Sequence, residues 1–248
     1  MKPELRCLSA AAGVLLALYT VNAALADEKN DPNIDAGKRM HVSRYDETAR
    51  SVNAPMYAYY AKKIKQQTGI SKGVCLDVGA GGGYLGLALA RITDLDFIFL
   101  DISQEMLEKA KQHIVEDGLQ NRAKTLLADV HSIPLEDASV DLVISRGSIP
   151  FWKDPATALK EIYRVLVPGG KAYVGGGRGP AKLREQIAAR RKKLGKALPE
   201  RRRDGNGPPS GPMGRMAQRK YDEILSNAGI TNFKISKGDD GMWIQMWK

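Results

Sequence analysis

The sequence predicts an α/β fold: a doubly wound, mostly parallel seven-stranded sheet that ends in an antiparallel edge hairpin strand. Within residues 74–175, short apolar runs typical of buried strands alternate with segments of helical apolar periodicity. This alternation is typical of a parallel sheet covered by helices. It then stops, and two apolar runs at 233–236 and 242–247 are close enough in sequence to pair as the hairpin.

The first strand runs into a glycine cluster. After the mostly apolar residues 74–78 come Gly79, Gly81 and Gly83, and a helical pattern begins near Leu85. Glycines permit positive φ angles and let a ligand approach the backbone closely, and the helix that follows presents free N–H groups to it. A strand, a glycine turn and a helix in this order are typical of a nucleotide-binding corner.

The later elements follow at the spacing of βαβ units. Ser103 is an N-cap residue for the next helix, and Gly118 ends that helix. Asp101 and Asp129 each follow a strand, which places both carboxylates at the same edge of the sheet as the glycine turn. In order, we expect strand 96–100, helix 103–117, strand 123–128, strand 140–145, helix 154–166 and strand 171–175.

The N-terminus has the pattern of an export signal. Lys2 and Arg6 precede an apolar run, and small residues at 24–26 offer a cleavage site before Asp27. We therefore expect a signal peptide over 1–26 and an exported protein, periplasmic or secreted. An uncleaved membrane anchor is the alternative, although the apolar run is short for a full span. A polar linker over 27–40 and a single catalytic domain over 41–248 would follow.

Cysteine usage excludes several classes of site. Without residues 1–26 the chain keeps one cysteine, Cys75, inside the first strand. A disulfide within the chain and a cysteine-based metal site are then impossible. We expect no metal site, and we interpret Cys75 as a small buried hydrophobic residue.

In these motifs the chain resembles the class I S-adenosylmethionine-dependent methyltransferases, which have a Rossmann-like fold. It is most similar to the small-molecule branch that includes quinone-biosynthesis methyltransferases. The resemblance covers about residues 55–175. Its motifs are Asp77-Val-Gly-Ala-Gly-Gly-Gly83, Leu100-Asp101, Ala128-Asp-Val-His-Ser-Ile-Pro134, Asp141-Leu-Val143 and the run from Leu159 to Lys171 that contains Pro168-Gly-Gly170.

The resemblance implies S-adenosyl-L-methionine as the cofactor and gives roles to its binding residues. Asp101 would accept from both ribose hydroxyls, Asp129 would accept from the adenine amine, and Asp77 would lie near the ammonium group. Gly79, Gly81 and Gly83 would shape the loop under the methionine moiety. The full set of expected cofactor-binding residues is Asp77, Gly79, Ala80, Gly81, Gly83, Asp101, Ile102, Asp129, Val130 and Ser145.

A nicotinamide dinucleotide fold is the main rival interpretation. Residues 81–86 match G-x-G-x-x-G, and Asp101 lies about where a ribose-binding acid would stand. The motifs at 129–134 and 168–170 have no role in such a fold, however, and no hydride-transfer pair is evident downstream. The methyltransferase interpretation explains more of the chain.

The segment after the fourth strand, residues 145–152, faces the transferred methyl group in this family. It lacks the Asn-Pro-Pro-Tyr motif of members that methylate planar nitrogens, so nucleic acid is an unlikely partner. No catalytic residue is evident. The weak candidates are Arg146, which could pair an acidic substrate or anchor the loop, and His41, which could be a base only if the N-terminal segment folds over the site.

A basic segment follows the fifth strand. Residues 178–220 contain 14 Lys or Arg and 3 Asp or Glu, a net charge of +11, whereas the whole chain carries +10. We interpret residues 178–213 as an insertion or lid. The basic arm over 178–220 could be a solvated arm, a surface for an anionic membrane, or a grip on an acidic substrate.

The sequence therefore predicts an S-adenosylmethionine-dependent methyltransferase that acts on an unidentified small-molecule or lipid-like acceptor. The alternative is an exported module that binds S-adenosylmethionine or a polyanion without catalysis.

Overall fold

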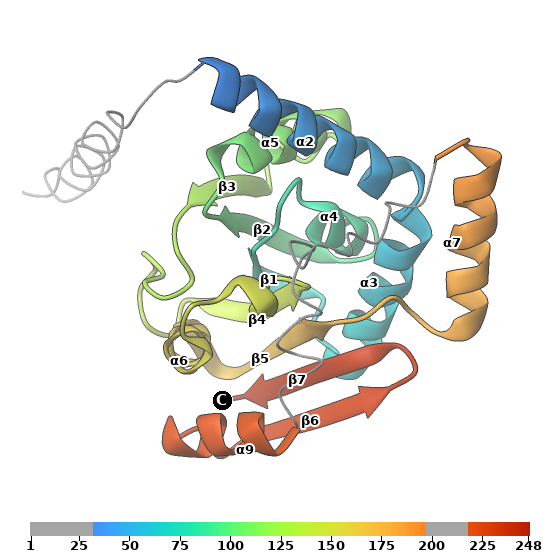
Figure 1. Cartoon of the computed structure of the whole chain (residues 1–248). Helices are drawn as coiled ribbons and strands as arrows, with labels where there is room; N and C mark the ends of the chain where they lie inside the picture. The colour runs from blue at the N-terminus through green and yellow to red at the C-terminus, as the bar shows by residue number, and fades with distance from the viewer. Residues whose placement is uncertain (1–31, 197–217) are drawn as a thin grey trace, which may run out of the picture. The chain divides into compact units, whose positions relative to one another are not determined.

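The computed structural model describes residues 32–196 and 218–248 (Figure 1). The chain divides into two compact units, one up to His41 and one from Val42 to Lys248. The expected signal peptide and residues 197–217 lie outside the described residues. Helix α2 (Pro32–Ser51) begins inside the stretch predicted to be a linker. Lack of apolar periodicity suggested a linker there, but a polar segment that begins with proline can also start a helix.

The second unit is built on one seven-stranded sheet in the order β3-β2-β1-β4-β5-β7-β6. Strands β1 to β5 run parallel, and β7 runs antiparallel to both β5 and β6. The predicted fold class is confirmed, with β7 as the antiparallel strand and β6 at the edge. The strands are β1 (Lys72–Val78), β2 (Asp94–Asp101), β3 (Ala123–Leu127), β4 (Val140–Arg146), β5 (Leu166–Gly176), β6 (Phe233–Gly238) and β7 (Gly241–Trp247).

Helices cover both faces of this sheet, as Figure 1 shows. Side chains alternate along each strand, so two separate apolar cores form, one on each face. One core is shared with α3, α4 and α5, and the other with α6 and α9. The helices are α3 (Ala54–Thr68), α4 (Tyr84–Ala90), α5 (Gln104–Glu116), α6 (Pro155–Val165), α7 (Ala181–Lys193) and α9 (Gln218–Asn227), with a short 3₁₀ helix η1 (Ile149–Phe151).

Crossover connections leave the carboxyl ends of β1 to β4 along one edge of the sheet. The strand order reverses next to β1, between the halves that begin with β2 and β4. Ligands bind parallel α/β sheets at the carboxyl side of such a switch point. The glycine turn after β1 therefore lies where the fold itself places a binding site. Within the described residues, no helix is long and apolar enough to cross a membrane.

Candidate functional site

The glycine turn adopts a backbone path that requires glycine. Gly79, Gly81 and Gly83 have φ angles of 65°, 55° and 80°, in the left-handed region. Gly83 is also the residue that precedes α4, so the turn ends by starting that helix. A Cβ on Gly79 would lie 2.4 Å from the Cβ of Ser148, so the loop after β4 packs directly on the turn.

Asp101 ends β2 beside this turn. Its Oδ2 accepts a hydrogen bond from the N–H of Gly81 at 2.7 Å, and its Oδ1 accepts from the N–H of Ser103 at 2.9 Å. Each carboxylate oxygen has a second lone pair. The carboxylate can therefore hold the glycine turn and still accept from two hydroxyls of a ribose, which is the role predicted for it.

Apolar side chains are exposed next to Asp101. Ile102 is 72% exposed, and Leu127, the partner of Asp101 across the β2–β3 ladder, is 41% exposed. Val130, which lies in the loop after β3, is buried. Exposed aliphatic groups beside a ribose-binding acid suit the face of a purine ring, and this arrangement fits the expected adenine pocket.

Asp77 is buried under the turn, only 2% exposed. Its Oδ2 accepts from the N–H of Gly86 in α4 at 3.0 Å. Burial raises the pKa of this carboxyl from 3.8 to about 7, opposed by the Gly86 hydrogen bond and assisted by the nearby charge of Asp101. A carboxylate that is costly to ionise gains from a cation beside it, and the ammonium group of the expected cofactor is such a cation.

The loop after β3 is held from two sides. The Asp129 carboxylate accepts from the backbone N–H of His131 at 2.9 Å and also from its ring Nδ1. The backbone bond is the main cause that lowers the pKa of Asp129. The other ring nitrogen, Nε2, accepts from the N–H of Asp154 at 3.1 Å. His131 is thus occupied on both nitrogens and orients the loop, while Asp129 remains partly exposed for an adenine amine.

Arg164 in α6 anchors the far end of the same loop. Its guanidinium donates to the carbonyl oxygens of Ile133 and Leu135 at 2.8 and 2.9 Å. It also pairs with Glu161, which accepts from the N–H of Ile133. These contacts explain why this loop and the α6 motif occur together in the sequence.

Ala80 and Ser145 have structural positions in the site. The N–H of Ala80 donates to the carbonyl of Leu100 at 3.0 Å, which ties the turn to β2. The buried Ser145 hydroxyl donates to the carbonyl of Val78 at 2.7 Å and lies 2.5 Å from the hydroxyl of Ser148. Ser145 therefore fixes the β4 loop on the glycine turn through its side chain.

His113 is a residue whose role the sequence did not show. Its place within the expected helix 103–117 suggests a solvated histidine, but His113 is 3% exposed, so that expectation is wrong. Its Nδ1 lies 2.8 Å from the carbonyl of Gly82, and its Nε2 lies 3.3 Å from the carboxylate of Asp46 in α2. The same carboxylate accepts from the Tyr84 hydroxyl at 2.8 Å. Asp46, His113 and Tyr84 together support the turn at the Gly82 carbonyl.

The two weak catalytic candidates differ in position. Arg146 ends β4, beside the site, and its side chain lies against α3. An arginine guanidinium keeps its charge at physiological pH, so this residue can bind or orient an acceptor but cannot take its proton. His41 belongs to α2 at the end of the first unit and is exposed. Its candidacy as a base stays a prediction.

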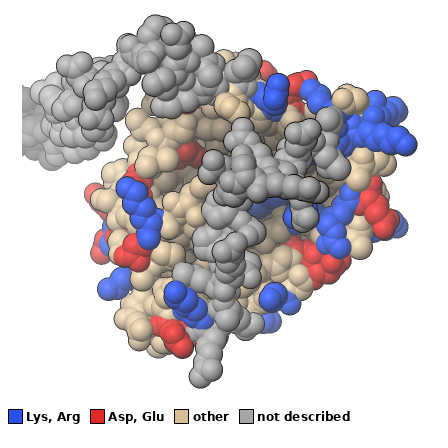
Figure 2. All heavy atoms as spheres, in the orientation of Figure 1, with Lys and Arg blue, Asp and Glu red and all other residues tan. Residues whose placement is uncertain are grey.

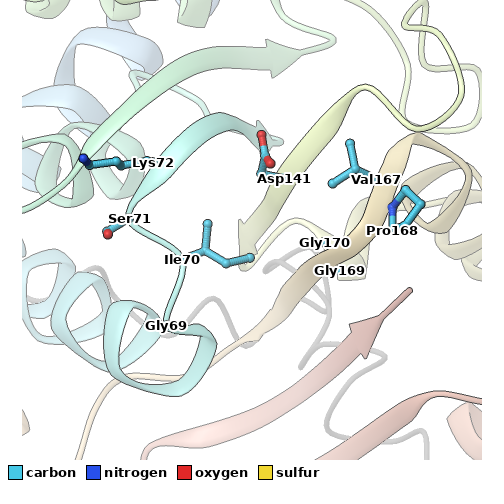
Figure 3. A pocket seen from close by; sticks show the side chains of 9 residues that line it. All are labelled: Gly69, Ile70, Ser71, Lys72, Asp141, Val167, Pro168, Gly169 and Gly170. Carbon is cyan, nitrogen blue, oxygen red and sulfur yellow. The ribbon is translucent and has the colours of Figure 1, made fainter.

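A shallow pocket at the opposite edge of the sheet does not belong to this site. Figure 3 shows its walls at the turn after α3, the starts of β1 and β4, and the first residues of β5. Asp141 lies there, and its Oδ2 accepts from the N–H of Val74 at 2.7 Å. The pocket is at the amino ends of the strands, away from the binding edge. In the described part of the chain, no group of three or more His, Cys, Asp or Glu could hold a metal ion.

The described part of the basic arm is a docked helix. Lysine and arginine gather at the upper right of Figure 2, where α7 lies in Figure 1. Leu183 is buried, and Ile187 packs on the core. Several basic groups bind the protein itself: Arg184 pairs with Asp239, Arg190 donates to the Ser51 carbonyl, and Lys196 pairs with Glu47. The start of the arm is thus not a freely solvated segment. The predicted Gly/Pro-rich loop over 201–213 lies outside the described residues.

The fold and the site define a nucleotide-cofactor enzyme of the class I methyltransferase type. A family model for a methyltransferase domain matches residues 76–174. A crystal structure from Methanococcus maripaludis, described as an S-adenosyl-L-methionine-dependent methyltransferase, is 35% identical with a TM-score of 0.72. That match covers 90% of this chain and 97% of the other.

Two curated relatives match part of the chain. The malonyl-[acyl-carrier protein] O-methyltransferase of Yersinia pestis is 38% identical over 106 residues, 43% of this chain and 36% of that protein. The ubiquinone/menaquinone biosynthesis C-methyltransferase UbiE of Rickettsia prowazekii is 37% identical over 101 residues, 39% of this chain and 41% of that protein. The chain spans less than half the length of either relative. It belongs to the S-adenosyl-L-methionine-dependent methyltransferases, and S-adenosyl-L-methionine is its cofactor.

Replacing Asp101 tests the ribose contact. We expect Asp101→Ala to weaken binding of S-adenosylhomocysteine at least roughly tenfold, because hydrogen bonds to a charged acceptor are worth about 1.5–3 kcal/mol. Titration calorimetry measures the effect. Asp96→Ala is the matched control, since Asp96 is an exposed carboxylate on the same strand. Equal affinities for Asp101→Ala and the control would contradict the assignment.

The raised pKa of Asp77 predicts a pH-dependent stability. Between about pH 4 and pH 7 the folded chain binds a proton at Asp77 that the unfolded chain has released. The free energy of unfolding should therefore fall as pH rises through this window, by up to about 4 kcal/mol for a shift of about three units. Asp77→Asn removes this contribution. Urea unfolding should therefore show that the stability of the variant rises relative to that of the wild type as the pH is raised from about 4 to about 7. A difference that stays flat from pH 4 to pH 8 would show that Asp77 titrates normally.

Proposed function

We propose that this chain transfers a methyl group from S-adenosyl-L-methionine to a small-molecule or lipid-like acceptor. The observation that carries the proposal is the arrangement of three acidic side chains around a glycine turn of positive φ. Asp77 lies under the turn, Asp101 lies beside it, and Asp129 lies in the next loop along the same edge. In this proposal each would accept from a different part of the cofactor.

The reaction makes modest chemical demands on the protein. S-adenosyl-L-methionine supplies a methyl group on a sulfonium, which is already an activated, charged leaving group. The chain must hold the donor, orient the acceptor in line with the methyl group, and exclude water. The turn and the Asp101 and Asp77 carboxylates suit the first task. The loop after β4, packed on the turn through Ser145 and Ser148, suits the second. A general base is needed only for an acceptor that holds its proton tightly.

The acceptor is best sought among small molecules and lipids. The two curated relatives methylate oxygen and carbon, as their names state, so likeness to them does not choose the acceptor atom. An anionic membrane surface remains the proposed partner of the 178–220 arm. The support for it is the positive net charge of that segment. Part of this charge is already neutralised, because Arg184 and Lys196 pair with carboxylates of the protein itself.

The assay uses labelled S-adenosyl-L-methionine and the purified chain from Asp27 onward. Small-molecule and lipid extracts of the native host serve as the acceptor pool. We expect label in an extractable product, with formation of S-adenosylhomocysteine and strongly reduced transfer by Asp101→Ala. Cofactor binding without transfer to either extract would favour the alternative of a binding module without catalysis. Absence of cofactor binding would overturn both.

We also propose that the protein acts after export. The support is the sequence of residues 1–26, with Lys2 and Arg6, an apolar run and small residues before Asp27. The mature protein should then begin Asp-Glu-Lys-Asn. N-terminal sequencing of the protein from fractionated native cells measures this, and an intact Met1 in the cytoplasmic fraction would refute export.

A further inference from the structure

We infer that Arg146 is a receptor for an anionic group, a carboxylate or a phosphate, on the methyl acceptor. This inference rests on the proposed function, because it concerns the acceptor side of the same site. Arg146 is the last residue of β4, and its neighbour Ser145 is hydrogen-bonded to Val78 at the start of the glycine turn. The backbone of Arg146 therefore starts next to the turn that would hold the donor.

The hydrogen bonds of Arg146 leave it with spare donors. Nη2 donates to the carbonyl of Gly177 at 2.6 Å and lies 2.9 Å from the sulfur of Met56. A guanidinium has five N–H donors, so the three on Nε and Nη1 have no partner among the described residues. Nε is buried without a partner, Nη1 is not among the described buried atoms that lack one, and the residue as a whole is partly exposed. An anchor for Gly177 alone would need only Nη2.

Among the residues that the structure describes, none supplies a counter-ion to Arg146. The guanidinium carbon lies 5.5 Å from the ring centroids of both Tyr57 and Tyr60 in α3. These ring faces stabilise a cation and keep it partly out of water. No carboxylate pairs with Arg146 within residues 42–196 and 218–248. A partly buried charge without an opposite charge is costly, and an incoming anion removes that cost.

The pair of tyrosine rings around Arg146 lies near the expected cofactor site. The ring of Tyr57 lies 5.3 Å from that of Tyr84, the first residue of α4, which packs on the glycine turn. The charge of Asp77 also contributes to the raised pKa of Tyr57, after burial and Tyr45. An anion on Nη1 would thus be held near the donor by charge-assisted N–H hydrogen bonds, which suit carboxylates and phosphates. A cationic acceptor would be repelled by this arrangement.

Binding of small anions to the protein saturated with S-adenosylhomocysteine tests the inference. The probes are benzoate and phenyl phosphate, with benzamide as the uncharged match for benzoate. We expect at least one anion to bind roughly tenfold or more tightly than benzamide, and the two anions distinguish a carboxylate from a phosphate receptor. Equal binding of benzamide and both anions by the wild-type protein would overturn the inference without any variant.

Two substitutions separate recognition from folding. Arg146→Met keeps an unbranched side chain against Tyr57 and Tyr60 but removes the charge, and it should lose at least roughly tenfold in anion affinity. Arg146→Lys keeps the charge but not the planar guanidinium, and it should lose less anion affinity than Arg146→Met. Both variants should bind S-adenosylhomocysteine within about twofold of the wild type. If cofactor binding is intact but no anion binds, only the Arg146 inference fails; if the cofactor does not bind, the proposed function fails. Undiminished anion binding by Arg146→Met would overturn the assignment.

Discussion

The site depends on the backbone path of the glycine turn after β1, because the expected binding residues are positioned by their contacts with this turn. The path is unfavourable for most residues, and its neighbours hold it on several sides. Ser148 leaves no room for a Cβ at Gly79, Asp101 accepts from the Gly81 amide, and His113 lies against the Gly82 carbonyl. Two polar backbone groups of the turn that would otherwise be left without partners are thus satisfied by side chains from β2 and α5.

The features predicted from sequence are those with local signals. The glycine spacing, the acid at each strand end and the alternation of apolar runs all lie within a few residues of one another. They were sufficient for the fold class with its antiparallel edge, for Asp101 beside the turn and for the β3 loop near the same edge. A strand end fixes the position of the residue that follows it, so carboxylates at strand ends can be placed without knowing any tertiary contact.

The features that were missed come from contacts between distant segments. Asp46 reaches Tyr84 and His113 across 38 and 67 positions of sequence, and no local pattern reports such a pair. His113 did carry a signal, however. It lies three residues after Ala110 and next to Ile114, on the apolar face of α5, so its helical position predicts burial. Weighing residue type above position gave the wrong interpretation.

The same limit applied to Arg146, for which the sequence left an acidic substrate and a structural anchor equally open. The deciding observations are tertiary: two tyrosine rings from α3 and spare donors on the guanidinium. They give the two halves of the site opposite electrostatic character. Asp77 and Asp101 make the side that faces the donor favourable for the cationic sulfonium and ammonium groups, and Arg146 makes the neighbouring side favourable for an anion. Tyr57 lies between them, 5.3 Å from Tyr84 and under the Arg146 guanidinium. A donor and an acceptor of opposite charge would each be repelled from the place of the other, so charge would favour one arrangement of the pair before packing sets the in-line geometry.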